Sequence, residues 1–276
     1  MGEKLRLDSA IFEKGFCDSR EKAKTLIMAG VVYVNNQKAD KCGMTIKPDD
    51  IIEVRSNPLK YVSRGGLKLE KAMNEFPINL ADATCADIGA STGGFTDCML
   101  QNGASKVYSI DVGYGQLAWK LRTDNRVVNL ERTNFRYVTK ELIPDELDFA
   151  SVDVSFISLS LIVPVMHTLM KNNAKAVCLI KPQFEAGKDK VGKKGVVRDK
   201  SVHIEVVSKT LELMIKTGFS VLGLTYSPIK GPEGNIEYLI FIEKSNNPEI
   251  LPHINGESVV LKSHEELDKT SKEGEK

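Results

Sequence analysis

The sequence predicts an α/β protein in which a doubly wound, mostly parallel sheet with an antiparallel last strand follows a small α+β module. From residue 83 onward, short apolar runs alternate with helical stretches, which is typical of a parallel sheet covered by helices. A short loop rich in proline and glycine joins the last two runs and leaves no room for a crossover helix. The first sixty residues follow a different pattern. A chain of 276 residues is long enough for both units.

The N-terminal pattern begins with a brief apolar stripe at helical spacing, followed by a clearer helix. This second helix is expected to start at Asp18, which stands three residues before Glu21 as in a capping box, and to end at Gly30. Residues 31–34 and 51–54 then predict two strands. The module is therefore expected to be two helices and a small sheet.

Several lysines and arginines of this module lie close together along the chain. Arg20 and Lys24 stand four residues apart on one helix face. Such charge more often belongs to a solvated helix face than to an RNA contact. The string from Arg6-Leu7-Asp8 through Ser19-Arg20-Glu21 to Val34-Asn35, however, resembles the S4-type RNA-binding domain. That resemblance implies phosphate contacts for Arg20 and Lys24, and the nearby charges of Arg6 and Lys22 are expected to join them.

Proline and the apolar runs divide the rest of the chain. Because Pro58 interrupts the strand pattern, we expect the module at 1–56, a linker at 57–64, the sheet domain at 65–245 and a polar tail at 246–276. The tail is expected to hold one helix near 259–267 and no chemistry. A helix carrying Lys68 precedes the sheet. The expected strands are 85–88, 107–112, 127–130, 149–154 and 176–180, all parallel, followed by 219–226 and 236–243 as an antiparallel pair.

A glycine-rich loop, Asp87 to Phe95, follows the first strand and opens a helix, where glycine lets the backbone approach a ligand closely. Ser91 stands where a dinucleotide fingerprint requires its second glycine, which disfavours an NAD-dependent dehydrogenase. Asp111, at the end of the second strand, is placed to accept hydrogen bonds from the ribose of either cofactor. The alternative is a turn that only packs a helix against a strand, and Asp111 makes this alternative less favoured.

Charged residues follow neighbouring strands of the predicted sheet. Asp153 ends the fourth strand and Lys181 the fifth, so both should lie at the carboxyl edge, where α/β proteins bind ligands. Glu237 begins the last strand, and Lys68 arrives from the preceding helix. Each residue alone is more often a solvated rim residue. A base beside a charge that tunes it is nevertheless what group transfer to a hydroxyl, a weak nucleophile, requires.

Four strings carry a second resemblance: Val62-Ser63-Arg64-Gly65-Gly66-x-Lys68-Leu69, the glycine-rich loop as far as Asp97, Asp111 to Leu117, and Lys181 to Glu185. Over about residues 4–243 they resemble the TlyA family, in which an S4-type domain precedes an FtsJ-type ribose methyltransferase. The resemblance implies a class I methyltransferase fold. It also implies transfer of a methyl group from S-adenosylmethionine to the 2′-hydroxyl of a cytidine in ribosomal RNA, with the target base unstacked.

The resemblance further implies roles for individual residues. FtsJ-type enzymes carry a Lys-Asp-Lys-Glu tetrad, here Lys68, Asp153, Lys181 and Glu237. Lys181 would activate the hydroxyl, Asp153 would tune it near the sulfonium, and the other two would orient them. Whether Lys181 is a true general base or only positions the hydroxyl is left open. The S-adenosylmethionine site is expected at Asp87, Gly89, Ala90, Ser91, Gly93, Gly94, Phe95, Asp111, Asn134 and Asp153.

Residues 181–200 form a strongly basic segment in a chain whose net charge is only +1. This segment contains seven basic and three acidic residues, and glycines stand at positions 187, 192 and 195. The pattern predicts a mobile basic loop that grips phosphates, and a disordered, solvated loop is the alternative. RNA contacts outside the N-terminal module are expected at Arg64, Lys188, Lys190, Lys193 and Lys194.

Metal and membrane sites find little support. The five cysteines are scattered without a CxxC pair, which predicts free thiols in a reducing compartment. His203-x-Glu205 lacks further ligands, and a surface helix explains it more simply. No segment approaches the roughly 20 apolar residues of a membrane span. We therefore expect no metal and a monomeric cytoplasmic protein, with ribosomal RNA or ribosomal subunits as its partner.

Two other functions stay open. Relatives of TlyA are often called haemolysins, and a membrane-lytic protein should carry a strongly amphipathic or spanning segment. A non-catalytic, RNA-binding assembly factor on a methyltransferase scaffold would need neither the glycine-rich loop nor the tetrad. Leakage of liposomes tests the first alternative, and calorimetric titration with S-adenosylmethionine tests the second.

Overall fold

The computed structural model describes residues 5–28, 30–39, 41–54, 60–231 and 233–273, with side chains up to residue 267 except that of Lys38. The chain divides into two compact units, 1–60 and 61–276, which are described separately. The second unit begins inside the expected linker 57–64, of which residues 57–59 lie outside the described residues. Tyr61 is buried in this unit, and the Val62 amide donates to the Asp97 carboxylate at 2.8 Å. Residues 61 and 62 are therefore packed.

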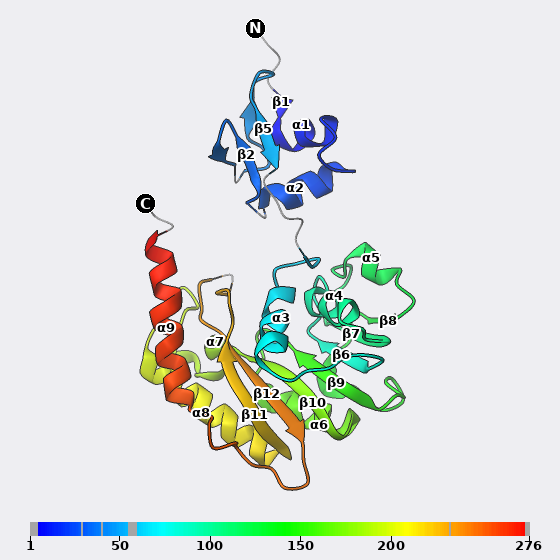
Figure 1. The fold of residues 1–276 in the computed structure, drawn as a ribbon, viewed down its shortest axis with the longest axis vertical. Coiled ribbons are helices and arrows are strands. Elements are labelled where there is room, and N and C mark those ends of the chain that lie inside the picture. The colour runs from blue at the N-terminus through cyan, green and yellow to red at the C-terminus, as the bar shows by residue number, and fades with distance from the viewer. Residues whose placement is uncertain (1–4, 29, 40, 55–59, 232, 274–276) are drawn as a thin grey trace. The chain divides into compact units, whose positions relative to one another are not determined.

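The first unit contains the two helices and the small sheet that the sequence predicts (Figure 1). Helix α2 begins at Arg20, and its cap is Ser19, one position after the expected Asp18, because Ser19 Oγ accepts a hydrogen bond from the Lys22 amide at 3.2 Å, while Asp18 pairs with the Lys22 side chain. Two-residue strands such as β3 are too short to leave a periodic signal. The elements are β1 (Leu5–Arg6), α1 (Leu7–Glu13), α2 (Arg20–Met28), β2 (Val32–Val34), β3 (Gln37–Lys38), β4 (Thr45–Ile46) and β5 (Ile52–Val54).

A seven-stranded sheet forms the centre of the second unit, in the order β11-β12-β10-β9-β6-β7-β8. Only β12 runs antiparallel to its neighbours, β10 and β11, and the other pairs are parallel. This topology confirms the predicted doubly wound sheet with an antiparallel last strand. The strands are β6 (Thr84–Ile88), β7 (Lys106–Ile110), β8 (Val127–Leu130), β9 (Leu147–Val152), β10 (Met170–Ile180), β11 (Phe219–Tyr226) and β12 (Tyr238–Lys244).

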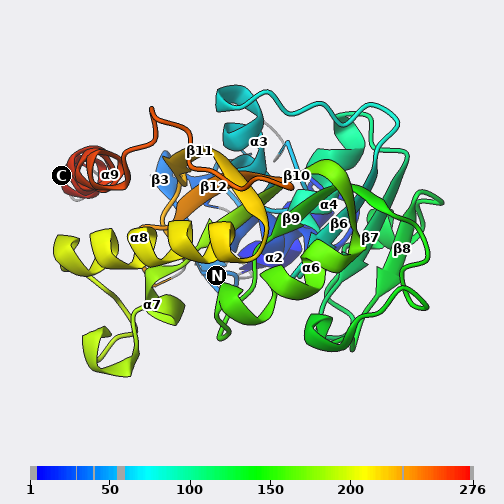
Figure 2. The ribbon, with the colours of Figure 1, turned by 90° about the horizontal axis from the view of Figure 1, so that it is seen from below.

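Helices cover both faces of this sheet, with α3 and α4 on one side and α6 and α8 on the other (Figure 2). Side chains of β10 alternate accordingly, since Val177 packs with the first pair and Cys178 with the second. The helices are α3 (Gly66–Glu75), α4 (Gly94–Gln101), α5 (Trp119–Arg122), α6 (Val163–Leu169), α7 (Pro182–Glu185), α8 (Lys200–Lys216) and α9 (Gly256–Glu273), with short 3-10 helices η1 (Phe135–Tyr137), η2 (Leu159–Leu161) and η3 (Lys188–Lys190).

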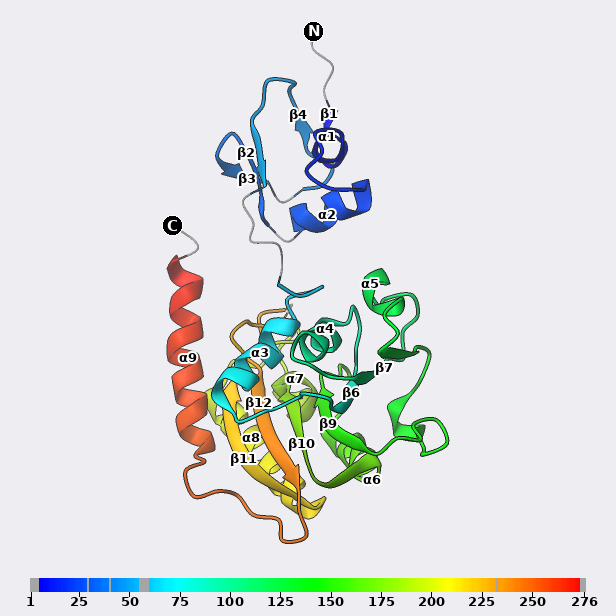
Figure 3. The same ribbon diagram turned by 45° about the vertical axis from the view of Figure 1, so that its right-hand side comes forward.

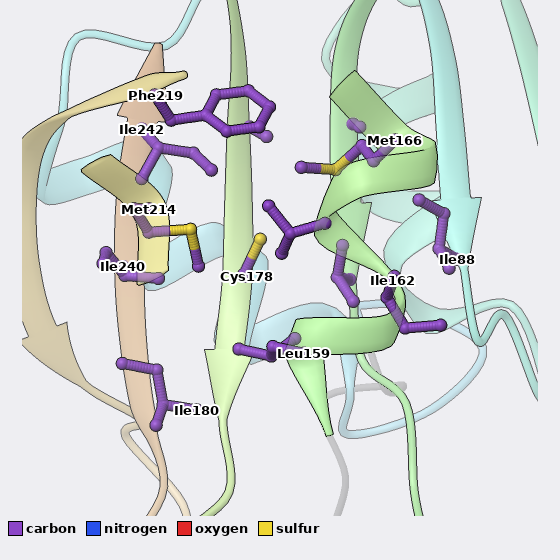
Figure 4. Packing of buried hydrophobic residues seen from close by; sticks show 14 of the residues in the cluster. Ile88, Leu159, Ile162, Met166, Cys178, Ile180, Met214, Phe219, Ile240 and Ile242 are labelled. Atoms are coloured by element: carbon purple, nitrogen blue, oxygen red, sulfur yellow. The ribbon is translucent and has the colours of Figure 1, made fainter. Parts of the chain in front are cut away.

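The larger hydrophobic core lies between the sheet and helices α6 and α8 (Figure 4). Ile240 of β12, Cys178 of β10, Met166 of α6 and Met214 of α8 are all fully buried there. Burying an aliphatic side chain of this size stabilises the fold by about 1.5–3 kcal/mol. This packing holds the carboxyl ends of β9 and β10 side by side.

The C-terminal segment is a packed helix, although the sequence suggested a polar tail at 246–276. Helix α9 lies beside α8 and β11 (Figure 3). Val260, Ser263 and His264 are buried, and the Tyr226 hydroxyl donates to Glu266. Within the described part of the chain, no helix is both long and apolar enough to span a bilayer.

Candidate active site

Three strand ends and one helix meet at the carboxyl edge of the sheet. Asp153 directly follows β9, and Lys181 directly follows β10. Because β12 is antiparallel to β10 and its register pairs Tyr238 with Ile180, the residue before β12, Glu237, reaches the same edge. Lys68 lies in the first turn of α3. The fold therefore brings together four residues that are far apart in the sequence.

The tetrad forms one continuous chain of opposite charges. The Lys68 Nζ atom lies 2.7 Å from Glu237 Oε2 and 3.4 Å from Asp153 Oδ2. The Lys181 Nζ atom lies 2.5 Å from Asp153 Oδ1 and also donates to Ser155 Oγ at 3.0 Å. Asp153 is thus shared between two ammonium groups.

The tetrad is largely shielded from water. Its side chains are 9% (Lys68), 19% (Asp153), 10% (Lys181) and 1% (Glu237) exposed. Burial opposes the charge on Lys68, but Asp153 and Glu237 outweigh it and raise the Lys68 pKa. Burial likewise opposes ionisation of Asp153, but the two lysines outweigh it and lower its pKa. Both groups are therefore charged at neutral pH.

A cavity of about 250 Å³ connects the tetrad with the glycine-rich loop. Gly89 adopts φ +88°, and a Cβ there would lie 2.4 Å from the Asp153 carbonyl oxygen. Ser91 adopts the left-handed conformation usually left to glycine, with φ +48°. The lining residues that the sequence predicted are Asp87, Gly89, Ala90, Ser91, Gly94, Phe95 and Asp153.

Three predicted cofactor residues, Gly93, Asp111 and Asn134, lie outside this lining. Asp111 braces the loop, accepting hydrogen bonds from the Ser91 amide at 2.8 Å and the Gly113 amide at 2.7 Å. Asn134 caps η1 by accepting from the Arg136 amide at 3.2 Å. Their contact with a cofactor stays a prediction.

Asp87 is a lining residue of the cavity and is buried. Burial raises its pKa to about 7, although its carboxylate accepts from the Thr96 amide at 2.8 Å and the Thr96 hydroxyl at 2.7 Å. Asp87 therefore fixes the start of α4 as well as lining the cavity.

Sequence reasoning did not assign Ser63, Gly65, Thr92 and Ser155 to the site, although all four line the cavity. Ser63, Gly65 and Thr92 fall inside the strings that carry the family resemblance, and Ser155 stands two residues after Asp153, which are the signals that could have found them. Ser155 is the most informative, because its hydroxyl contacts Lys181 at 3.0 Å.

A second cavity of about 720 Å³ shares Ser155, Lys181 and Glu237 with the first. One wall carries Phe156, which is 90% exposed and adopts φ +63°. Its ring lies 5.0 Å from that of Phe184, centroid to centroid. The tetrad therefore stands where a small polar cavity opens into a larger one with aromatic side chains.

The cations predicted to bind RNA fall into two groups. Arg64, Lys188, Lys193 and Lys194 are exposed. The others contact carboxylates: Arg6 and Arg20 contact Asp8, Lys22 contacts Asp18, Lys24 contacts Glu21, and Lys190 contacts Glu205.

The basic loop is anchored at its C-terminal end. Asn235 Oδ1 accepts from the Val197 amide at 3.0 Å, and His203 Nε2 lies 3.0 Å from the Val197 carbonyl oxygen. A carbonyl only accepts, so Nε2 carries the proton. The expectation that His203 and Glu205 lie on a surface helix is wrong for His203, which is fully buried on the inner face of α8.

A parallel sheet with one reversed strand, and a glycine loop after its first strand, define a class I methyltransferase. A model of FtsJ-like methyltransferases matches residues 61–244, and a model of the S4 domain matches residues 5–52. The chain belongs to the FtsJ-like methyltransferases and, within them, to the TlyA family.

Similar proteins cover almost the whole chain. It is 50% identical to "Putative rRNA methyltransferase YqxC" of Bacillus subtilis over 98% of this chain and 96% of that protein. It is 40% identical to "16S/23S rRNA (cytidine-2'-O)-methyltransferase TlyA" of Mycobacterium tuberculosis over 88% and 91%, respectively. The solved structure of a "Putative hemolysin" from Streptococcus thermophilus matches with a TM-score of 0.79 and 44% identity, covering 99% of this chain and 100% of that one.

S-adenosylmethionine is the methyl donor of this class, and the smaller cavity fits it. Its sulfonium and ammonium groups are cationic, and the wall offers the carboxylates of Asp153 and Glu237. Gly89 and Gly94 let the loop pack closely around the cavity, since an added Cβ would lie 2.4 Å from the Asp153 carbonyl oxygen or 2.5 Å from Ser63 Oγ, respectively.

Replacing Gly89 by alanine is expected to weaken S-adenosylmethionine binding at least about tenfold. The left-handed conformation alone costs an alanine about 1–2 kcal/mol, and the new Cβ at 2.4 Å from the Asp153 carbonyl would push the loop away. Calorimetric titration measures the affinity. Gly103→Ala is the matched control, since Gly103 has φ +95° near the far end of α4 and no atom closer than 3.3 Å to its added Cβ. Equal affinities for wild type and Gly89→Ala would contradict the placement.

Proposed function

We propose that this protein transfers a methyl group from S-adenosylmethionine to the 2′-hydroxyl of a cytidine in ribosomal RNA. The observation that carries the proposal is the buried chain of charges from Glu237 through Lys68 and Asp153 to Lys181, at the junction of the two cavities. The relative from Mycobacterium tuberculosis is named as a cytidine 2′-O-methyltransferase of both ribosomal RNAs, which supports the substrate class.

The tetrad would act mainly by positioning and by accepting a proton. S-adenosylmethionine supplies an electrophilic methyl group and a neutral thioether leaving group. The Lys181 ammonium would first release a proton to solvent, and the resulting amine would take the proton of the 2′-hydroxyl while the O–C bond forms and the S–C bond breaks. Asp153 would orient Lys181 through their 2.5 Å contact, and Lys68 would hold Asp153 from the other side. The carboxylate of Glu237 would balance the positive charge of the Lys68 ammonium group.

The target nucleoside would occupy the larger cavity. A ribose hydroxyl inside a duplex cannot reach a buried group, so the nucleotide must leave its stack. Phe156 offers an exposed ring for the extruded base, since aromatic side chains stack on bases. Lys181 belongs to both cavities and would meet the ribose at their boundary.

The deciding experiment incubates the full chain and labelled S-adenosylmethionine with each ribosomal subunit from cells that lack the gene. Mapping of modified riboses should find a 2′-O-methylcytidine in one subunit or in both. A label on a base, on protein, or on nothing would reject the proposal.

The exposed lysines of the basic loop give a second test. The double variant Lys193→Ala/Lys194→Ala is expected to weaken RNA binding and to reduce the slope of log affinity against log salt by about two, since each phosphate contact contributes about one. Filter binding over a range of salt concentrations measures the slope. Lys171 and Lys216 serve as the control pair, because they lie at the opposite edge of the sheet. A slope equal to the wild-type value would exclude phosphate contacts of these two lysines.

A further inference from the structure

Two loops face each other along one wall of the larger cavity. The first segment is the loop after β9, which carries Asp153, Phe156 and Ser158. The second segment follows β10 and consists of Lys181 and the short helix α7. Lys181 contacts Asp153, and the ring of Phe184 contacts that of Phe156. Past these two contacts, a third one joins the loops through Glu185.

Glu185 binds the loop with both carboxylate oxygens. Oε2 accepts from the Ser158 hydroxyl at 2.7 Å, and Oε1 accepts from the Leu159 amide at 2.8 Å. The Leu159 amide stands at the start of η2, where a helix supplies no partner of its own. Burial raises the pKa of Glu185. A partly buried carboxylate that is bound twice to one loop is well suited to fix that loop.

Phe156 is the residue of this loop whose conformation must be held by its neighbours. Its φ of +63° is unfavourable for a bulky residue, so the surrounding structure must hold it. Phe156 is 90% exposed and therefore receives little support from the core. The bonds of Glu185 begin two residues later, at Ser158, and α7 also provides Phe184 as the neighbouring ring.

We propose that Glu185 is a positioning residue that holds Phe156 and Phe184 in the arrangement that receives the extruded nucleoside. The inference rests on the proposed function and assigns to it a residue that does not itself touch the cofactor cavity. Glu185 lines neither cavity itself and acts through Phe156, Ser158 and Phe184, which line the larger cavity and not the smaller one.

The test is a double-mutant cycle on full-length protein with ribosomal subunits as substrate. Phe156→Ala and Glu185→Ala are each expected to lower kcat/KM about tenfold or more, within the range of a lost base–aromatic stack. The combined variant should be no worse than Phe156→Ala alone, because the two changes remove the same contact. Affinity for S-adenosylmethionine should stay within about twofold of wild type.

A conservative variant and a milder variant distinguish a positioning role of Glu185 from a general effect on folding. Glu185→Gln should restore most of kcat/KM, since its amide oxygen can accept from Leu159 and its amide nitrogen can donate to Ser158. Ser158→Ala removes one of the two bonds and should show the same coupling to Phe156 with a smaller loss, even if Glu185→Ala fails to fold. Glu212→Ala, on an exposed part of α8, is the control.

The outcomes are distinct. Losses that multiply in the combined variant, or an equal fall in S-adenosylmethionine affinity, would overturn the role of Glu185 while leaving the proposed function intact. A wild-type protein that methylates neither subunit would overturn both.

Discussion

Replacing Lys181 by alanine is expected to lower the turnover of ribosomal RNA by about 10²- to 10⁴-fold, the usual contribution of a general base. S-adenosylmethionine should still bind, because the glycine-rich loop and Asp153 remain in place. Single-turnover measurements with saturating cofactor give the rate, and calorimetry gives the cofactor affinity.

Lys175→Ala is the matched control for this variant. Lys175 belongs to the same strand, β10, but pairs in register with Glu243 toward the opposite edge. Its replacement should leave turnover unchanged. If Lys181→Ala methylates RNA at a near-normal rate, Lys181 is not the group that activates the hydroxyl.

Replacing Lys68 by methionine is expected to destabilise the second unit by about 3–5 kcal/mol, the usual cost of breaking a buried ion pair. The variant leaves the carboxylate of Glu237, which is only 1% exposed, without its ammonium partner at 2.7 Å. Chemical denaturation followed by circular dichroism measures the change.

The double variant Lys68→Met/Glu237→Leu should recover most of this loss. It removes one charge of each sign and leaves Asp153 paired with Lys181. Methyl transfer should stay low in both variants, which would separate the catalytic need for these charges from their effect on stability. Lys171→Met at the exposed pair with Asp148 should cost less than about 1 kcal/mol. A double variant as unstable as the single one would show that the two residues do not act as a pair.

The sequence was a good guide to the sheet because buried parallel strands read as continuous apolar runs. All seven predicted strands are present, and each differs from its expected bounds by a few residues at most, except β10, which starts at Met170 instead of 176. That extra length is polar and exposed in Lys171, Asn172 and Asn173, so it left no apolar signal. Helix α9 was underestimated because only one side of it packs on the unit.

The positions of the tetrad residues could be predicted from the ends of the strands and from the family resemblance. The larger cavity could not be predicted from the sequence. The left-handed backbone of Phe156 and its ring contact with Phe184 depend on tertiary structure, and nothing in the local sequence announces either. His203 was assigned to a surface helix because the pair His203-x-Glu205 lacks the further ligands that a metal site would need. Its burial depends on Tyr238, which contacts His203 Nδ1 at 2.6 Å across 35 positions of sequence.

The reversed direction of β12 determines which of its ends faces the chemistry. Had this strand run parallel to β10, Lys244 would stand beside Lys181, and Glu237 would lie on the far side of the sheet, roughly 20 Å away at about 3.3 Å per residue. Lys68, Lys181 and Asp153 would then lie together with a third lysine, Lys244. The site would have no second carboxylate. The antiparallel direction of β12 thus brings in the carboxylate of Glu237, which makes the total charge of the tetrad neutral. A site that is shielded from water and binds a cationic methyl donor depends on this neutrality.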